Sequence, residues 1–223
     1  MRERPRKSPR QESNYETMYR YVYSVKRNTA KVKTVAIVGR GKTCQHAPFD
    51  NAEVDIWAFN DNAHTLYKEK RLTAMFEMHP DWMTAPRLEG VPGIPEYREW
   101  LKLPHNFPIY THGIDRRIPA SVAYPFEKIN YIFRNTLFKG EVEVKNLYTS
   151  TTPYAIALAI LQTYKRIELY GIELSQETEY REHRDSVFLW IGRASAMGVQ
   201  VHIHEDSKLY RPALYPIMGT NKP

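Results

Sequence analysis

Residues 171–184, with the sequence GIELSQETEYREHR, gather acids, a phenol, an imidazole and a guanidinium on one short stretch. Its ionisable residues include Glu173, Glu177, Glu179, Tyr180, His183 and Arg184. Carboxylate, imidazole and phenol groups are the side chains that proteins use to move protons. The stretch follows a short β run, Arg166–Tyr170, and in an open α/β sheet ligands bind at the loops beyond the carboxyl ends of the strands. We therefore expect residues 171–184 to be a loop that carries the chemistry.

A second candidate site follows the apolar run Thr34–Val38, which is typical of a strand buried on both faces of a parallel sheet. The run ends in Gly39-Arg40-Gly41, and glycines at this place let the backbone approach a ligand closely. The GxGxxG dinucleotide pattern lacks its third glycine, and the Walker A pattern that would end in Gly41-Lys42-Thr43 lacks its first. The remaining hypothesis is a mononucleotide-type loop that includes Lys42.

Two more predicted strands, Val54–Phe59 and Leu72–Glu77, also end in polar residues. Asn60 offers donors and acceptors that could read a nucleobase or ribose edge, but asparagine is equally common in plain turns. His79 could hydrogen-bond a ligand, or it could be an ordinary lone histidine. The sequence leaves both pairs of alternatives open.

A predicted apolar helix, Pro153–Tyr164, precedes the Arg166–Tyr170 run. Residues 149–152 supply hydroxyl groups where a helix N-terminus presents unpaired N–H groups, and proline suits the first helical position. Such hydroxyls cap a helix in any protein. That Thr149 and Ser150 also bind a nucleotide is therefore a hypothesis.

These elements predict an α/β fold with a Rossmann-like, mostly parallel sheet and helices on both faces. A chain of 223 residues with 42% apolar content suits one ordinary core, and we expect a single domain over residues 31–223. The other expected elements are helices at Tyr97–Leu101, Phe126–Phe133 and Asp185–Met197, and strands at Phe107–Tyr110 and Val199–Ile203.

Residues 1–30 are predicted to be a separate basic arm, with a disordered Arg- and Pro-rich start and then a short amphipathic helix. Most of the net charge of +7 lies here, because residues 1–33 hold ten Lys and Arg against three Glu. Four tyrosines, at positions 15, 19, 21 and 23, are interleaved with Arg20, Lys26 and Arg27, and such a mixture can stack on nucleobases in a basic groove. The alternative is a helix that docks on the domain or on a second subunit.

The sequence also bears on compartment and metals. Cys44 is the single cysteine, so no intramolecular disulfide can form, and the first ten residues lack the apolar stretch of a secretory signal. The longest apolar run, Ala155–Leu161, is far shorter than the ~20 residues that span a bilayer. We therefore expect a soluble, cytoplasmic protein.

His202 and His204 lack the partners of a zinc set, and no DxD pair occurs, so no metal site is expected.

From Val35 to about Leu209, the chain resembles the bacterial sialyltransferases of glycosyltransferase family 42 and the sialyltransferase-like proteins of bacteria and their phages. Gly39-Arg40-Gly41 is similar to their Gly-Asn-Gly nucleotide loop, and Phe59-Asn60 to their base and ribose contact. Thr149-Ser150 and the helix that carries Tyr154 are similar to their Ser/Thr-rich turn and apolar helix. The most specific match is Ile167–Glu173, which resembles their strand and Gly-Ile-Asp motif.

The resemblance implies a role for each matching residue. His183 corresponds to the family's general base, and Tyr180, with Arg184 beside it, to the group that holds the leaving phosphate. The chain departs from the family at three places, since it has Lys42-Thr43 for Pro-Ser, Glu173 for aspartate, and Ser175 for a second tyrosine. The donor implied is a CMP-sugar by analogy, or a UDP-sugar.

The expected function is a metal-independent glycosyltransferase that holds no permanent cofactor and moves a sugar from a nucleotide donor to an acceptor hydroxyl by direct displacement. The basic arm favours a hydroxymethylated base in phage DNA as the acceptor, and a cell-surface glycan is the alternative. Two other classes stay open. One is a pterin-type pyrophosphokinase, which needs a triphosphate and Mg²⁺. The other is a non-catalytic nucleotide- or nucleic-acid-binding protein. All of these functions are compatible with a homo-oligomer.

Overall fold

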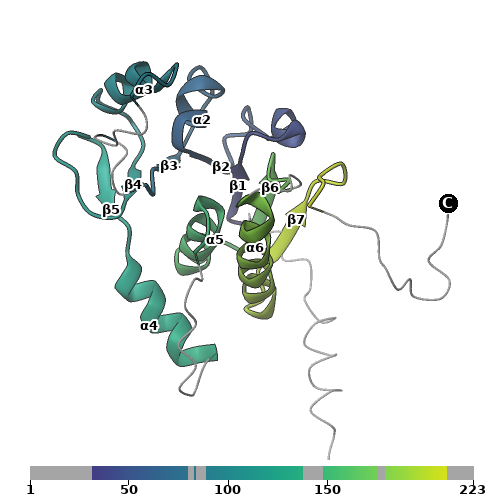
Figure 1. Ribbon diagram of the computed structural model, residues 1–223. Helices are drawn as coiled ribbons and strands as arrows, with labels where there is room; N and C mark the ends of the chain where they lie inside the picture. Colours follow the sequence, from purple (N-terminus) through teal and green to yellow (C-terminus); the bar gives the residue numbers. More distant parts are fainter. Residues whose placement is uncertain (1–31, 80–82, 84–88, 138–147, 175–178, 210–223) are drawn as a thin grey trace, which may run out of the picture. The chain divides into compact units, whose positions relative to one another are not determined.

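The computed structural model describes residues 32–79, 83, 89–137, 148–174 and 179–209 (Figure 1). All of them belong to one compact unit, Val32–Pro223. The predicted arm, with its helix and the residues Arg20, Lys26 and Arg27, lies outside the described residues. None of the described helices is long and apolar enough to cross a membrane.

The described residues form one seven-stranded sheet in the order β5-β4-β3-β2-β1-β6-β7, and every neighbouring pair is parallel. The strands are β1 (Thr34–Val38), β2 (Val54–Phe59), β3 (Ala74–Phe76), β4 (Ile109–Thr111), β5 (Ser121–Ala123), β6 (Arg166–Tyr170) and β7 (Gln200–Ile203). The chain order reverses at β1, which pairs with β2 on one side and β6 on the other. The predicted α/β class is confirmed.

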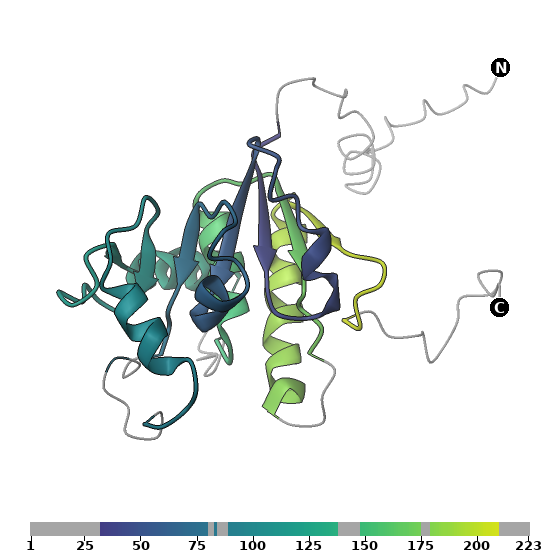
Figure 2. The same ribbon diagram turned by 90° about the horizontal axis from the view of Figure 1, so that it is seen from above.

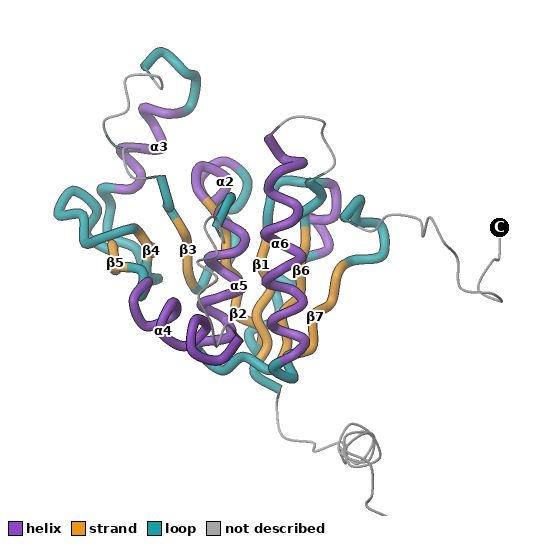
Figure 3. Tube along the Cα trace, turned by 60° about the horizontal axis from the view of Figure 1, so that its bottom comes forward, coloured by secondary structure: helices purple, strands orange, loops and turns teal. Residues whose placement is uncertain are grey.

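Two layers of helices cover the sheet (Figures 2 and 3). The helices are η1 (Lys42–His46), α2 (Asn60–Thr65), α3 (Ile94–Leu101), α4 (Phe126–Leu137), α5 (Thr151–Leu161) and α6 (Glu179–Ala196). Alternate residues of β1 point to opposite layers: Val35 and Ile37 belong to the core with α4, α5 and α6, whereas Ala36 and Val38 belong to the core with η1, α2 and α3. Helices on both faces, as predicted, leave the carboxyl ends of the strands as the open edge.

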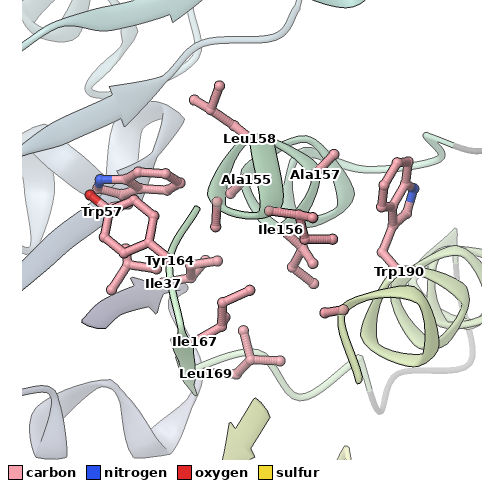
Figure 4. Packing of buried hydrophobic residues seen from close by; sticks show 14 of the residues in the cluster. Ile37, Trp57, Ala155, Ile156, Ala157, Leu158, Tyr164, Ile167, Leu169 and Trp190 are labelled. Carbon is pink, nitrogen blue, oxygen red and sulfur yellow. The ribbon is translucent and has the colours of Figure 1, made fainter. Parts of the chain in front are cut away.

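Among the described helices that pack on the sheet, α5 is the most completely buried. Ile156 and Ala157 are fully buried, and Figure 4 shows α5 between Trp57 and Tyr164 on one side and Trp190 of α6 on the other. A helix that is apolar on all sides must be covered on all sides. Its N-terminus is therefore fixed at the open edge of the sheet, next to the ends of β1 and β6.

The main departure from the sequence prediction concerns residues 171–184. Helix α6 begins at Glu179, so His183 and Arg184 lie on a helix and not on a loop. Acidic residues favour the first turn of a helix because they complement its dipole, and the polar composition of this stretch is that of a helix start. Strand β3 is shorter than the predicted Leu72–Glu77, and the sequence did not predict the short elements α2 and β5.

Helix α5 ends with a strained residue. Thr163 has a φ of 61°, a left-handed conformation that a β-branched side chain disfavours, and it is exposed. Thr163→Gly is therefore expected to raise the free energy of unfolding by about 1 kcal/mol, measured by urea denaturation. Lys128→Gly, at an exposed position within α4, is the matched control and should lower it by about 0.7 kcal/mol. Destabilisation by both substitutions would contradict the prediction.

Candidate functional site

A cavity of about 690 Å³ opens at the carboxyl ends of β1, β2, β3 and β6 and at the N-terminus of α5. The structure brings together at its wall the following residues that the sequence predicted as site residues: Gly39, Arg40, Gly41, Asn60, His79, Thr149, Ser150, Tyr154, Glu173 and His183. They come from segments up to 144 positions apart, between Gly39 and His183. This edge is where ligands bind in doubly wound sheets, next to the strand at which the chain order reverses.

The floor of the cavity is a close approach of two glycines. Gly39 N–H donates to the Tyr170 carbonyl at 2.8 Å, and Gly41 N–H donates to the Gly171 carbonyl at 2.8 Å. A Cβ atom on Gly39 would lie 2.5 Å from the Gly171 oxygen, and one on Gly171 would lie 2.7 Å from the Gly39 oxygen. Only glycine fits at either position, and Gly171 also has a φ of 64°.

Side chains hold these glycines in place from below. Gly171 N–H donates to Thr43 Oγ1 at 2.7 Å, and the buried Tyr67 hydroxyl donates to the Gly39 carbonyl at 2.5 Å. Burial raises the Tyr67 pKa, so the hydroxyl stays a donor. Lys42, which the sequence analysis assigned to the nucleotide loop, is exposed on η1 and does not line the cavity. The 3-10 turn that begins at Lys42 directs Thr43 inward instead.

Buried polar atoms without a partner among the described residues gather at this cavity. They are Asn60 Oδ1, Asn62 Oδ1, Tyr148 OH, Thr149 Oγ1, Ser150 Oγ and Glu173 Oε1, and all six residues line it. An unsatisfied buried polar group costs about 1–3 kcal/mol, so a cluster of them is unusual in a folded protein. Asn60 adds backbone strain, with a φ of 48°. The cluster is what a site prepared for a polar ligand would look like.

At the N-terminus of α5 the structure corrects the expectation that the hydroxyls cap the helix. Ser150 is the N-cap residue, yet its side chain makes no capping hydrogen bond, and the Thr149 hydroxyl is likewise buried without a partner among the described residues. The two hydroxyls therefore do not act as helix caps. They are available to a ligand at the helix N-terminus, where the dipole favours negative charge.

Tyr148 is a cavity residue that the sequence analysis did not identify. Its ring stacks on Tyr154 with centroids 4.5 Å apart and planes 17° apart, and burial raises its pKa, so its hydroxyl stays protonated. The Tyr154 carbonyl accepts a hydrogen bond from Tyr124 at 2.9 Å, which fixes the pair. The available signal was the position of Tyr148 beside Thr149. The sequence also missed Asp61, Asn62, Met78 and Leu174 as lining residues.

The acid and base of the Gly171–Arg184 stretch divide between two elements. Glu173 lies after β6 against Gly41, where a Cβ atom would be 2.7 Å from its carboxyl carbon. His183 is half-buried on α6 and lines the cavity. Arg40, between the two floor residues Gly39 and Gly41, donates to Asp61 Oδ2 through Nη2 at 2.9 Å. The cavity thus holds an imidazole, a carboxylate and a guanidinium around the glycine floor.

Arg184 does not reach this cavity. Its side chain is buried, Nη2 donates to the Leu209 carbonyl, and the guanidinium lies 4.9 Å from the centre of the Phe188 ring. Arg184 does not line the cavity because, on a helix, it points about 100° away from its neighbour His183. The Arg184 guanidinium holds the chain after β7, which corrects its predicted phosphate contact. The Tyr180 side chain lies outside the described residues.

His46, His204 and Asp206 form a cluster of ligand-type atoms, all within 4.8 Å of one another, beside η1 and β7. The two imidazole rings stack with centroids 4.5 Å apart and planes 16° apart. Lone pairs in nearly parallel rings do not converge on one point, and the Asp206 N–H donates to His204 Nδ1 at 3.2 Å. None of the three residues lines the cavity.

No protein-family model and no curated protein matches the chain. Among solved structures, it is similar to the sialyltransferase CstII from Campylobacter jejuni in complex with cytidine-5'-monophosphate, with 15% identity, 79% of this chain and 82% of that chain covered, and a TM-score of 0.46. It is also similar to the α-2,3-sialyltransferase Cst-I from the same organism, with 15% identity, 81% and 78% coverage and a TM-score of 0.48.

Proposed function

We propose that the chain is a glycosyltransferase that takes a sugar from a nucleotide donor and passes it to an acceptor hydroxyl. The observation that carries the proposal is the group of buried, unpartnered hydrogen-bonding atoms around the Gly39–Gly171 floor. A nucleotide sugar offers the matching groups, because its base, ribose, phosphate and sugar all need partners. The sequence resemblance points to the same class.

The nucleotide is proposed to lie over the glycine floor, where backbone can approach it closely. Thr149 and Ser150 would donate their hydroxyls to phosphate or ribose oxygens, and Asn60 Oδ1 would accept from a base amino group or a ribose hydroxyl. Glu173, as a carboxylate, can only accept, so it suits a ribose hydroxyl or an exocyclic amine and would repel phosphate. The donor is proposed to be a CMP-sugar or a UDP-sugar.

The transfer is a direct displacement. The acceptor oxygen bonds to the anomeric carbon while its proton passes to the His183 imidazole, and the bond from that carbon to the phosphate oxygen breaks with its electron pair leaving on the nucleotide. Hydroxyl and N–H donors near α5 would stabilise the leaving phosphate, with Tyr180 assigned to it by resemblance. Since the sequence holds no DxD pair, activity is expected to persist in a chelator.

A hydroxymethylated base in DNA is the proposed acceptor, because the basic, tyrosine-rich residues 1–30 suit a polyanion. Such a base must be flipped out of the duplex, or lie in single-stranded DNA, to reach a cavity. Removal of residues 1–27 should abolish the salt-dependent binding of oligonucleotides at low ionic strength. Unchanged affinity after the truncation would favour a glycan acceptor.

The nucleotide site is tested by binding. CMP or UMP is expected to raise the melting temperature of the full chain, because a ligand of the folded state alone stabilises it. Ser150→Ala and Asn60→Ala should each weaken the Kd about tenfold, since each removes one hydrogen bond in a buried site. His202→Asn, at an exposed position on β7, is the control and should leave the Kd unchanged. The absence of any nucleotide effect on melting would contradict the proposed function.

A further inference from the structure

At the β3 end of the cavity, a buried carboxylate holds a histidine. Glu77 is 2% exposed, and its Oε1 accepts hydrogen bonds from His79 Nδ1 at 2.7 Å and from the His79 backbone N–H at 3.1 Å. Its Oε2 accepts from the Tyr97 hydroxyl at 2.7 Å. Both oxygens are thus bonded, which offsets the desolvation of the carboxylate. Burial raises the Tyr97 pKa, as does the nearby Glu77, so Tyr97 stays a donor.

The backbone around this pair is also fixed on both sides. The Glu77 N–H donates to the Tyr110 carbonyl at 2.8 Å, and His112 Nε2 donates to the Met78 carbonyl at 2.7 Å. His79 itself has a side chain that is 38% exposed and lies at the cavity wall. A histidine whose ring Nδ1 and backbone N–H both bond the same carboxylate oxygen has an imidazole with little freedom to rotate. The arrangement prepares one ring orientation before a ligand arrives.

The Glu77 carboxylate also decides the chemistry of the ring. A carboxylate only accepts hydrogen bonds, so Nδ1 carries a proton, and in the neutral ring Nε2 is then the nitrogen with the lone pair. A lone pair accepts a hydrogen bond from a hydroxyl group and repels the oxygens of a phosphate. His79 therefore suits a neutral hydroxyl-bearing molecule better than the phosphate of a nucleotide.

The position of His79 in the sheet agrees with this chemistry. The glycine floor lies at β1 and β6, whereas His79 follows β3, which is separated from β1 by β2. Two inter-strand spacings amount to roughly 10 Å, so His79 lies well to one side of the glycine floor.

We infer that His79, held by Glu77, binds a hydroxyl group of the sugar acceptor through Nε2, which makes the β3 end of the cavity its acceptor side. The inference rests on the proposed function, and it moves His79 from the predicted nucleotide contacts to the acceptor. Glu77 is a positioning residue that acts through His79.

The first test needs no enzyme activity. In the full chain with ¹⁵N-labelled histidine, His79 is expected to give the NMR signature of the neutral Nδ1–H tautomer near neutral pH, and His79→Asn assigns its signals. Glu77→Ala should remove the preference for the Nδ1–H tautomer, because no carboxylate oxygen then accepts from Nδ1. A protonated Nε2 in the wild-type chain would overturn the inference, since that atom could then bind phosphate.

The second test separates the two substrates. His79→Asn keeps a donor for Glu77 and removes Nε2, so its Kd for CMP should stay within about twofold of wild type, while the acceptor KM rises about tenfold. Transfer is measured from CMP-sialic acid to lactose and to a single-stranded oligonucleotide containing 5-hydroxymethylcytosine. A tenfold loss of CMP affinity would overturn the inference. If the wild-type chain consumes no donor, the proposed function fails, whereas the tautomer and CMP measurements still decide the role of His79.

Discussion

A Gly171→Ala variant is expected to lose both stability and nucleotide binding. The new methyl group would lie 2.7 Å from the Gly39 carbonyl oxygen and 2.9 Å from Cys44 Cβ, and Gly171 has a φ of 64°. Overpacking costs roughly 1–3 kcal/mol and a left-handed alanine about 1–2 kcal/mol, so the free energy of unfolding should fall by about 2–5 kcal/mol. Because β1 and β6 must separate to admit the methyl group, the cavity floor is distorted as well.

The measurements are urea denaturation and CMP binding by calorimetry. Gly192→Ala is the matched control, because Gly192 is exposed within α6 and a Cβ atom there would meet nothing within 4 Å. That control should gain about 1 kcal/mol of stability, since alanine is the better helix former, and should bind CMP as the wild type does. Wild-type stability and CMP affinity in Gly171→Ala would show that the glycine contact is not required.

His183→Asn is expected to lower the rate of transfer about 10²- to 10⁴-fold, which is the usual contribution of a general base. Asparagine can hydrogen-bond but cannot take up the acceptor proton. Since His183 lies on α6 and not on the glycine floor, the Kd for CMP should change less than about threefold, so kcat falls while donor binding persists.

His202→Asn is the control for this substitution, because His202 is an exposed histidine of β7 that does not line the cavity. It should transfer sugar at the wild-type rate. Donor turnover by His183→Asn at the rate of the control would assign the proton to another group, and His79 is then the other histidine of the cavity wall to examine.

Much of the site could be predicted from the sequence because polar residues follow buried strands in a recognisable order. Asn60, Thr149 and Glu173 each come directly after an apolar run, or just before an apolar helix, and parallel strands end at the same edge of a sheet. The predicted position of each at a common cavity is therefore a consequence of local pattern and one topological rule. The same reasoning placed Lys42 at the cavity, whereas the structure leaves it outside. A sequence pattern gives the position of a residue but not the direction of its side chain on a 3-10 turn.

Other parts of the site depend on contacts between segments far apart in the chain. The bond between Glu77 and Tyr97 joins β3 to α3, and no local pattern marks Glu77 as buried, because its strand ends there. Whether the Ser150 hydroxyl caps α5 also depends on geometry that hydrogen-bonding potential alone does not give. Likewise, Arg184 and His183 are neighbours in a polar stretch, and only the start of α6 at Glu179 directs them to different surroundings.

The amino-acid sequence by itself determined the fold class, the glycine turn after β1, and most of the residues at the cavity wall, because hydrophobic periodicity and strand-end residues are local properties. The tertiary structure alone decided that Gly39 and Gly171 meet, that six buried polar atoms at the cavity wall lack partners among the described residues, and that His79 is held by Glu77. Each of these depends on distances across the sheet, where the partner of a side chain is set by how β1, β3, β6 and the helices pack.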